Sequence, residues 1–373
     1  MAITEPKIIA PDSSHWAKWI DATISGDHAR RAQALGLHER LLDLGRIPLL
    51  SWHHLEELLG VEDDETARSR VAFIQSLPLI AWMRLPHEEA GLGSIIQVLA
   101  AEAVAASEGC LGLVSIRDRA RQLMLRTGPG SDAIGSESWV WGAMRPLLRA
   151  RQPQIDMVAA LSPLRTFDES RTIGELARKS VKSPDEMRAQ LRVIYDKALQ
   201  EATNSTGGDA HRAKAMADQF MTRVIAHLPT PGTTVRDLLV STLVSQGLDA
   251  EEIRDECVLA DLSELGLFRS QLRVVASETG RSFDDLKGVS MAVLPSRVIG
   301  DALRKHGQHR KKRPGSDLSD AYLGVLAAYC DVLYVDKRTA EDFRRAIGKE
   351  PKLSGLIGDV AKAVDFADLL GGS

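Results

Sequence analysis

Short apolar runs that read as buried strands are concentrated near the two ends of this chain of 373 residues. Near the N-terminus they cover residues 7–10, 47–51 and 77–83, and near the C-terminus residues 332–335. Runs of this length, bounded by proline or polar residues, are typical of buried strands rather than helices. Stretches with helical spacing lie between them, and this alternation predicts an α/β core.

Helical periodicity dominates the long stretch between the two groups of strands. From about residue 92 to residue 285, apolar residues recur at three- and four-residue spacing and strand signals are nearly absent. The sequence therefore predicts a discontinuous core of residues 1–90 and 290–373, interrupted by an all-α insertion over residues 91–289.

Local signals mark several helices of the core. Residues 63–76, 317–330 and 337–348 have helical patterns, and Ser51 is placed to cap a helix that ends at Gly60. His53 and His54 lie in that helix as HHLEE, which is not the HExxH zinc pattern. We expect packing or surface roles for both histidines.

Composition and missing motifs exclude several classes of protein. The net charge is only −4, so affinity for nucleic acid must come from a local patch. Cys110, Cys257 and Cys330 have no CxxC spacing, which argues against disulfides and thiolate zinc sites and for a reducing cytoplasm. There is no leader pattern and no apolar stretch near the roughly 18 residues of a membrane helix. We expect a soluble cytoplasmic protein without membrane contact.

No phosphate loop (GxxxxGK[ST]), dinucleotide fingerprint (GxGxxG) or serine elbow (GxSxG) occurs in the chain. The sequence therefore gives no support for an ATPase, a dinucleotide enzyme or a serine hydrolase.

Acidic residues lie next to the predicted strands at three places. They are Asp12 after the first strand, Glu56 and Glu57 in the helix after the second, Asp317 and Asp320 in the helix before the last, and Asp336 at the end of the last. Ligands of open parallel sheets bind beyond the carboxyl ends of the strands, so these carboxylates are expected to converge. Because clustered carboxylates repel one another, Mg²⁺ or Mn²⁺ is the expected cofactor. A metal-bound water would then hydrolyse a phosphodiester.

Three segments together resemble the PIN-like domain nuclease family. The run GSDLSDAYLGVLAAYCDVLYVDKRT (315–339) is similar to the family's C-terminal signature, IIAPDSS to its opening strand, and PLLSWHHLEEL to its second strand and the helix that carries its Glu. The resemblance implies a central parallel sheet flanked by helices. It also implies that the metal-site and catalytic residues are Asp12, Glu57, Asp320 and Asp336, with Asp317 a further metal ligand and Asp331 accessory.

The resemblance implies a Mg²⁺- or Mn²⁺-dependent endoribonuclease, with RNA preferred over DNA. Glu57 is preferred to Glu56 because it directly precedes an apolar residue. The long insertion departs from the family and leaves the substrate and any protein partner open. The alternative is a catalytically weak PIN-like scaffold whose helical insertion mediates protein interaction in a regulatory or defence assembly.

Each acidic residue also has an ordinary structural interpretation. Asp12 fits a helix N-cap, and Glu57 fits a solvated helix surface. Asp317 and Asp320 fit first-turn acids that complement a helix dipole. Asp336 fits one side of a surface ion pair.

The densest charge run of the chain, RKHGQHRKKR (304–313), directly precedes the acidic helix. A charge run is most often a solvated loop, but an acidic site that admits a polyanion needs cations nearby. The residues expected to contact the nucleic-acid backbone are Lys305, Arg310, Lys311, Lys312 and Arg313.

Overall fold

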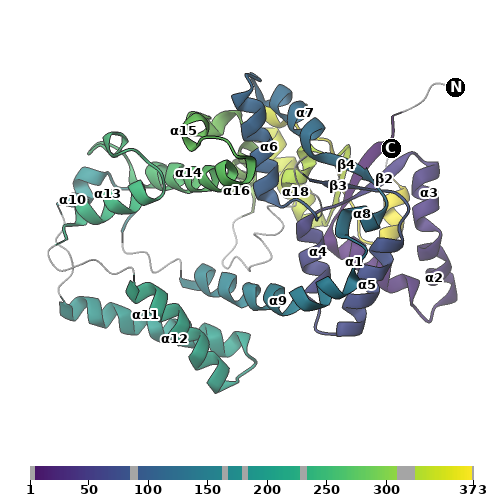
Figure 1. Cartoon of the computed structure of the whole chain (residues 1–373), viewed down its shortest axis with the longest axis horizontal. Helices are drawn as coiled ribbons and strands as arrows, with labels where there is room; N and C mark the ends of the chain where they lie inside the picture. The colour runs from purple at the N-terminus through teal and green to yellow at the C-terminus, as the bar shows by residue number, and fades with distance from the viewer. Residues whose placement is uncertain are drawn as a thin grey trace. The chain divides into compact units, whose positions relative to one another are not determined.

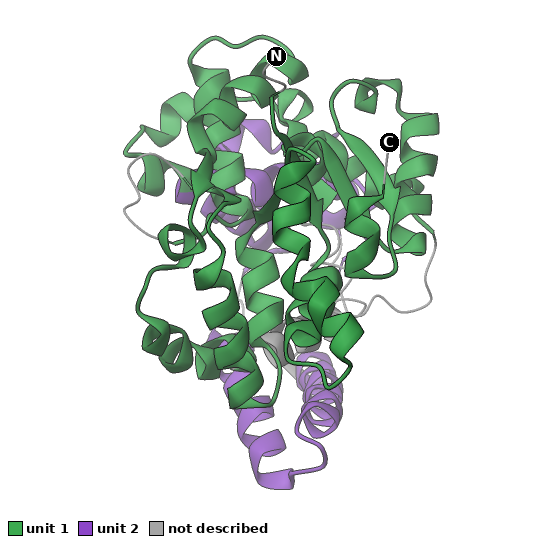
Figure 2. Cartoon of the chain, turned by 90° about the vertical axis from the view of Figure 1, so that its right-hand side faces the viewer, with its two compact units in different colours: residues 1–149, 275–373 green, residues 150–274 purple. Residues whose placement is uncertain are grey.

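The computed structural model describes residues 5–84, 91–161, 167–178, 184–226, 233–308 and 324–371. By compactness the chain divides into two units (Figure 2). Unit 1 comprises Met1–Arg149 and Val275–Ser373, and unit 2 comprises Ala150–Val274. No helix among the described residues is long and apolar enough to cross a membrane.

Unit 1 is built on a six-stranded sheet with the order β4-β3-β2-β1-β5-β6. Figure 1 labels β2, β3 and β4 of this sheet. The strands are β1 (Lys7–Pro11), β2 (Arg46–Leu50), β3 (Ile80–Met83), β4 (Leu125–Gly128), β5 (Val332–Val335) and β6 (Asp359–Lys362). The pairs β3–β2, β2–β1, β1–β5 and β5–β6 are parallel, and β4 pairs antiparallel with β3. The fold is therefore mixed α/β, as the sequence predicts.

The four strands expected from apolar runs are present as β1, β2, β3 and β5. Two further strands lack such runs. The segment LRTG of β4 forms by pairing with β3, from Ile80–Gly128 to Met83–Leu125. The segment DVAK of β6 is a partly exposed edge strand. The sequence predicted an all-α insertion over residues 91–289. That prediction is wrong, because β4 lies within this range.

The helices of unit 1 fall into two packed groups. Those that pack on one core are α1 (Ser13–Thr23), α4 (Trp52–Leu59) and α5 (Asp64–Ser76), joined by α2 (His28–Leu35) and α3 (Leu37–Asp43). Those of the second group are α6 (Ile95–Ser107), α7 (Leu113–Met124), α16 (Pro295–His306) and α18 (Lys337–Lys349). In the first group Trp16 and Trp19 are fully buried and stack with ring centroids 5.2 Å apart.

The helices expected over residues 63–76 and 337–348 are confirmed as α5 and α18, and Ser51 caps α4. Of the helix expected over residues 317–330, residues 317–323 lie outside the described residues. The described part tightens into a 3₁₀ turn at Leu326–Ala328 before β5. Helix α16 was not predicted from the sequence, and Pro295 is its first residue. It occupies the start of the helix, where its missing N–H costs nothing.

The described part of unit 2 is helical apart from one isolated bridge between Thr172 and Val258. Its helices are the second half of α9 (Ser138–Leu161), α10 (Ile173–Ala177), α11 (Pro184–Ser205), α12 (Ala210–Ala226), α13 (Val235–Ser245) and most of α14 (Leu259–Thr279). Helices α11 and α12 form a hairpin whose buried contact consists of four alanines, Ala198, Ala202, Ala213 and Ala217. Small side chains at four-residue spacing let the two backbones approach closely.

Candidate functional site

The carboxyl edge of the sheet has a topological switch point between β1 and β5. From β1 the chain proceeds to β2 and β3 on one side, whereas β5 and β6 lie on the other. Open α/β sheets bind ligands beyond the carboxyl ends of the strands at such a switch point.

Asp12 and Asp336 follow the two strands at this switch point. Pro11 is in register with Tyr334, and the backbone N–H of Asp12 donates to the carbonyl oxygen of Tyr334 at 2.9 Å. Asp336 begins α18 directly after β5. The structure therefore brings these two acids from opposite ends of the chain to neighbouring strand ends at one edge.

Both acids are also helix N-caps. For Asp12 this confirms the ordinary interpretation, whereas for Asp336 the sequence analysis expected a surface ion pair and missed the cap. Oδ1 of Asp12 accepts the N–H of Ser14 at 2.7 Å, and Oδ1 of Asp336 accepts the N–H of Thr339 at 2.7 Å. Partial burial acts to raise the pKa of Asp336, but hydrogen bonds from Thr339 outweigh it and the pKa is lowered. A carboxylate has two oxygens, so capping through Oδ1 and binding a cation through Oδ2 are compatible.

The donor set at this edge fits a Mg²⁺ or Mn²⁺ ion. Mg²⁺ commonly binds one or two protein carboxylates and keeps several waters, and Asp12 and Asp336 supply two. Among the described residues, no group of three or more His, Cys, Asp or Glu side chains is arranged to hold a metal ion. Asp317 and Asp320 lie outside the described residues.

Of the other expected acids, those that the structure describes lie on α4 and at the amino edge of the sheet. Glu57 is exposed on α4, which starts at the same edge because Ser51 directly follows β2. Glu56 is less exposed, and its Oε2 lies 3.8 Å from Nδ1 of His53. Asp331 lies at the amino edge, where its Oδ2 accepts the N–H of Ile8 at 2.6 Å and faces Arg121 at 3.4 Å. Asp331 therefore joins the start of β1 to the start of β5. It lies at the edge of the sheet opposite to Asp12 and Asp336, so it is not accessory to their site.

The basic run is only partly within the described residues. Lys305 is in the last turn of α16, and its Nζ lies 3.3 Å from Oε1 of Glu350. Nε2 of His306 lies 3.1 Å from the same oxygen. Arg310, Lys311, Lys312 and Arg313 lie outside the described residues. The charge of Lys305 is thus already shared with a carboxylate of its own chain.

Two buried histidines next to Asp12 were not expected to take part in this edge. His15 is in the first turn of α1, and burial lowers its pKa, an effect partly offset by Asp12. His54 accepts the N–H of Ser51 at Nδ1, and burial lowers its pKa to about 4. A sequence signal existed for His54, because Ser51 and His54 have the spacing of a capping box.

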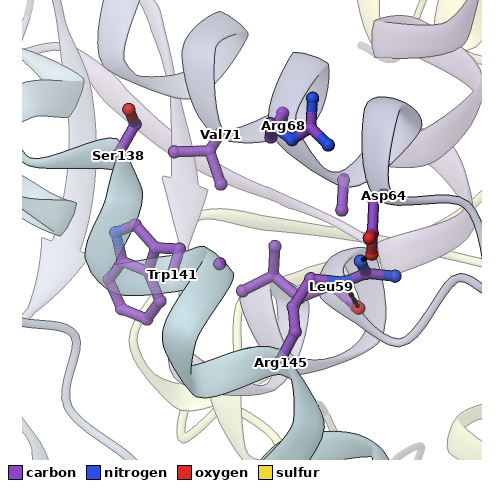
Figure 3. Close-up of a pocket in the computed structure, with 9 residues that line it drawn as sticks. Leu59, Asp64, Arg68, Val71, Ser138, Trp141 and Arg145 are labelled. Atoms are coloured by element: carbon purple, nitrogen blue, oxygen red, sulfur yellow. Dashed lines mark hydrogen bonds and ion pairs between the residues drawn. The ribbon is translucent and has the colours of Figure 1, made fainter.

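A separate pocket of about 240 Å³ lies between α5 and the start of α9 (Ser138–Leu161) (Figure 3). Its walls include Leu59, Val71 and Trp141. In Figure 3 the guanidinium of Arg145 points at Asp64 and at the carbonyl of Leu59, which it contacts at 3.0 Å. Among the described residues, no candidate acid lines this pocket, and its buried Arg145 is already paired with Asp64.

No protein-family model, no characterised protein and no solved structure matches the chain, so the likeness to PIN-like nucleases rests on the three sequence segments alone.

Proposed function

We propose that this protein is a Mg²⁺- or Mn²⁺-dependent nuclease that hydrolyses phosphodiester bonds, with RNA preferred over DNA. The observation that carries the proposal is the placement of Asp12 and Asp336 at neighbouring strand ends, at the switch point of the sheet. Glu57, Asp320 and Asp317 are the further acids of the same site in this proposal.

The roles of the chain's own groups follow from this placement. Asp12 and Asp336 would hold the cation through the oxygens that do not cap helices. When bound, such an ion supplies an activated water and stabilises the charge that develops on the phosphate. The first turns of α1 and α18 begin at the same edge, and helix N-termini favour a phosphate anion.

The experiment exploits the fact that Asp12 and Asp336 are also caps. Asparagine caps a helix about as well as aspartate, so Asp12→Asn and Asp336→Asn keep the cap and remove only the charge. We expect cleavage of labelled single-stranded RNA, with Mn²⁺ present, to fall by roughly a hundredfold or more in each variant and in Asp320→Asn. Cleavage of single-stranded DNA of the same sequence measures the preference for RNA.

Asp63→Asn is the matched control. Asp63 caps α5 through the N–H of Thr66 at 2.6 Å, and it precedes a helix that does not follow a strand. This variant should cleave like the parent. Full activity of Asp12→Asn and Asp336→Asn would show that the two acids are only caps. A parent without activity would favour the scaffold alternative.

A further inference from the structure

The imidazole of His54 connects the end of β1 with the start of α4. The side chain is 1% exposed. Its Nδ1 accepts the backbone N–H of Ser51 at 2.9 Å, and the ring also hydrogen-bonds the carbonyl oxygen of Pro11. Because Nδ1 receives a proton from the backbone, the ring proton is on Nε2, which donates to Pro11.

This bridge lies where the backbone ladder is incomplete. The pairing of β1 with β2 ends at Ile9 and Pro48, short of the carboxyl edge. On its other side β1 stays bonded to β5 as far as Asp12. The carbonyl of the buried Pro11 needs a donor, and His54 provides it. The ring therefore holds the end of β1 on its β2 side, as the backbone hydrogen bond from Asp12 to Tyr334 holds it on its β5 side.

We propose that His54 is a positioning residue for the metal-binding carboxylate of Asp12, an inference that rests on the proposed nuclease function. Pro11 directly precedes Asp12, so a donor to the Pro11 carbonyl sets the orientation of the peptide that carries the acid. Ser51 directly precedes α4, so the same ring also fixes the helix that bears Glu57. Groups that orient metal ligands contribute about 10–100-fold to metal affinity or activity.

The test compares His54→Gln with the parent in the full chain. Glutamine at this position accepts the N–H of Ser51 as in an ordinary capping box, but it lacks the rigid donor to Pro11. Mn²⁺ titration followed by the electron paramagnetic resonance of the free ion should show a Kd about 10–100-fold higher. Cleavage of single-stranded RNA should fall at low Mn²⁺ and recover at saturating Mn²⁺, which a general loss of structure would not allow.

His38→Gln is the matched control. His38 is also buried, and its Nε2 lies 2.7 Å from the carbonyl oxygen of Leu79, which precedes β3 at the amino edge. The variant removes the same kind of contact at the other end of the sheet. Its Kd for Mn²⁺ should equal that of the parent.

The outcomes separate the two proposals. A parent chain that binds no Mn²⁺ overturns both the nuclease function and the role of His54. A parent that binds Mn²⁺, with His54→Gln no weaker than His38→Gln, overturns the role of His54 alone. If His54→Gln does not fold, His54→Asn, whose shorter amide also accepts from Ser51, is measured against the same criterion.

Discussion

The backbone N–H of Asp12 donates to the carbonyl oxygen of Tyr334 at 2.9 Å, joining the residue after β1 to the strand that ends just before Asp336. This contact sets the two acids at the same level of the sheet although they lie at opposite ends of the sequence. Asp12 and Asp336 are therefore the two acids through which we propose that this edge holds a cation.

The buried carboxyl group of Glu102 should make unit 1 less stable as the pH rises. Its side chain is 0% exposed, accepts from Ser296 N–H at 2.9 Å and from the Tyr329 hydroxyl, and burial raises its pKa to about 7. Because the folded state holds this proton more tightly than the unfolded chain, stability is lost as the pH rises from about 4.5 to about 7.

Glu102→Gln isolates this contribution. The free energy of unfolding of the variant relative to the parent should rise by about 3 kcal/mol between pH 4.5 and pH 8. Urea denaturation followed by tryptophan fluorescence measures it, and all six tryptophans belong to unit 1. A difference that does not change with pH would show that folding leaves the pKa of Glu102 at its unfolded value.

Arg145 of α9, which donates to the last carbonyl of α4, should be sensitive to substitution. It is 5% exposed, pairs with Asp64, and donates to the carbonyls of Leu59 and Val61. Arg145→Met keeps the aliphatic stem but leaves those carbonyls without a donor, so the free energy of unfolding should fall by about 2–4 kcal/mol. Arg68→Met, at the exposed rim of the same pocket, should change it by less than about 0.5 kcal/mol. Equal effects of the two substitutions in urea denaturation would contradict this interpretation.

The basic run should determine how binding of nucleic acid depends on salt. If its residues contact phosphates, log affinity falls with log salt by about 0.7 per contact on a single strand. Replacing Arg310, Lys311 and Lys312 with Gln should weaken binding to all sequences and flatten that slope by up to about two units. Lys305→Gln should change the slope less, because Lys305 already pairs with Glu350. An unaltered slope in the triple variant would place the nucleic acid elsewhere.

The strands that the sequence predicted are those whose own residues demand burial. Ile8, Ile9 and Ala10 of β1 are buried on both faces of the sheet, and such runs are visible without a structure. β4 and β6 could not be predicted in this way, because LRTG and DVAK become strands only through the partner beside them. The boundaries of the two units could not be predicted either, because they depend on contacts between segments that are distant in the sequence.

The sequence could predict those site residues that directly follow a strand. Asp12 and Asp336 were identified because they follow apolar runs, and the parallel register then places them together. Asp331 also flanks a strand, but on its amino side, and the sequence did not distinguish the two edges. The bridge of His54 to Pro11 was missed because hydrogen bonds to backbone carbonyls of distant segments leave no sequence pattern.

The most direct test of the account is the affinity of the full chain for Mn²⁺ in the parent, Asp12→Asn, Asp336→Asn and Asp63→Asn. All three variants keep a capping residue, so their folds should match the parent by tryptophan fluorescence. Asp12→Asn and Asp336→Asn should each bind Mn²⁺ at least tenfold more weakly, roughly the minimum expected when a charged ligand is lost. Asp63→Asn should bind like the parent. Equal affinity in all four proteins would contradict a metal site at the ends of β1 and β5.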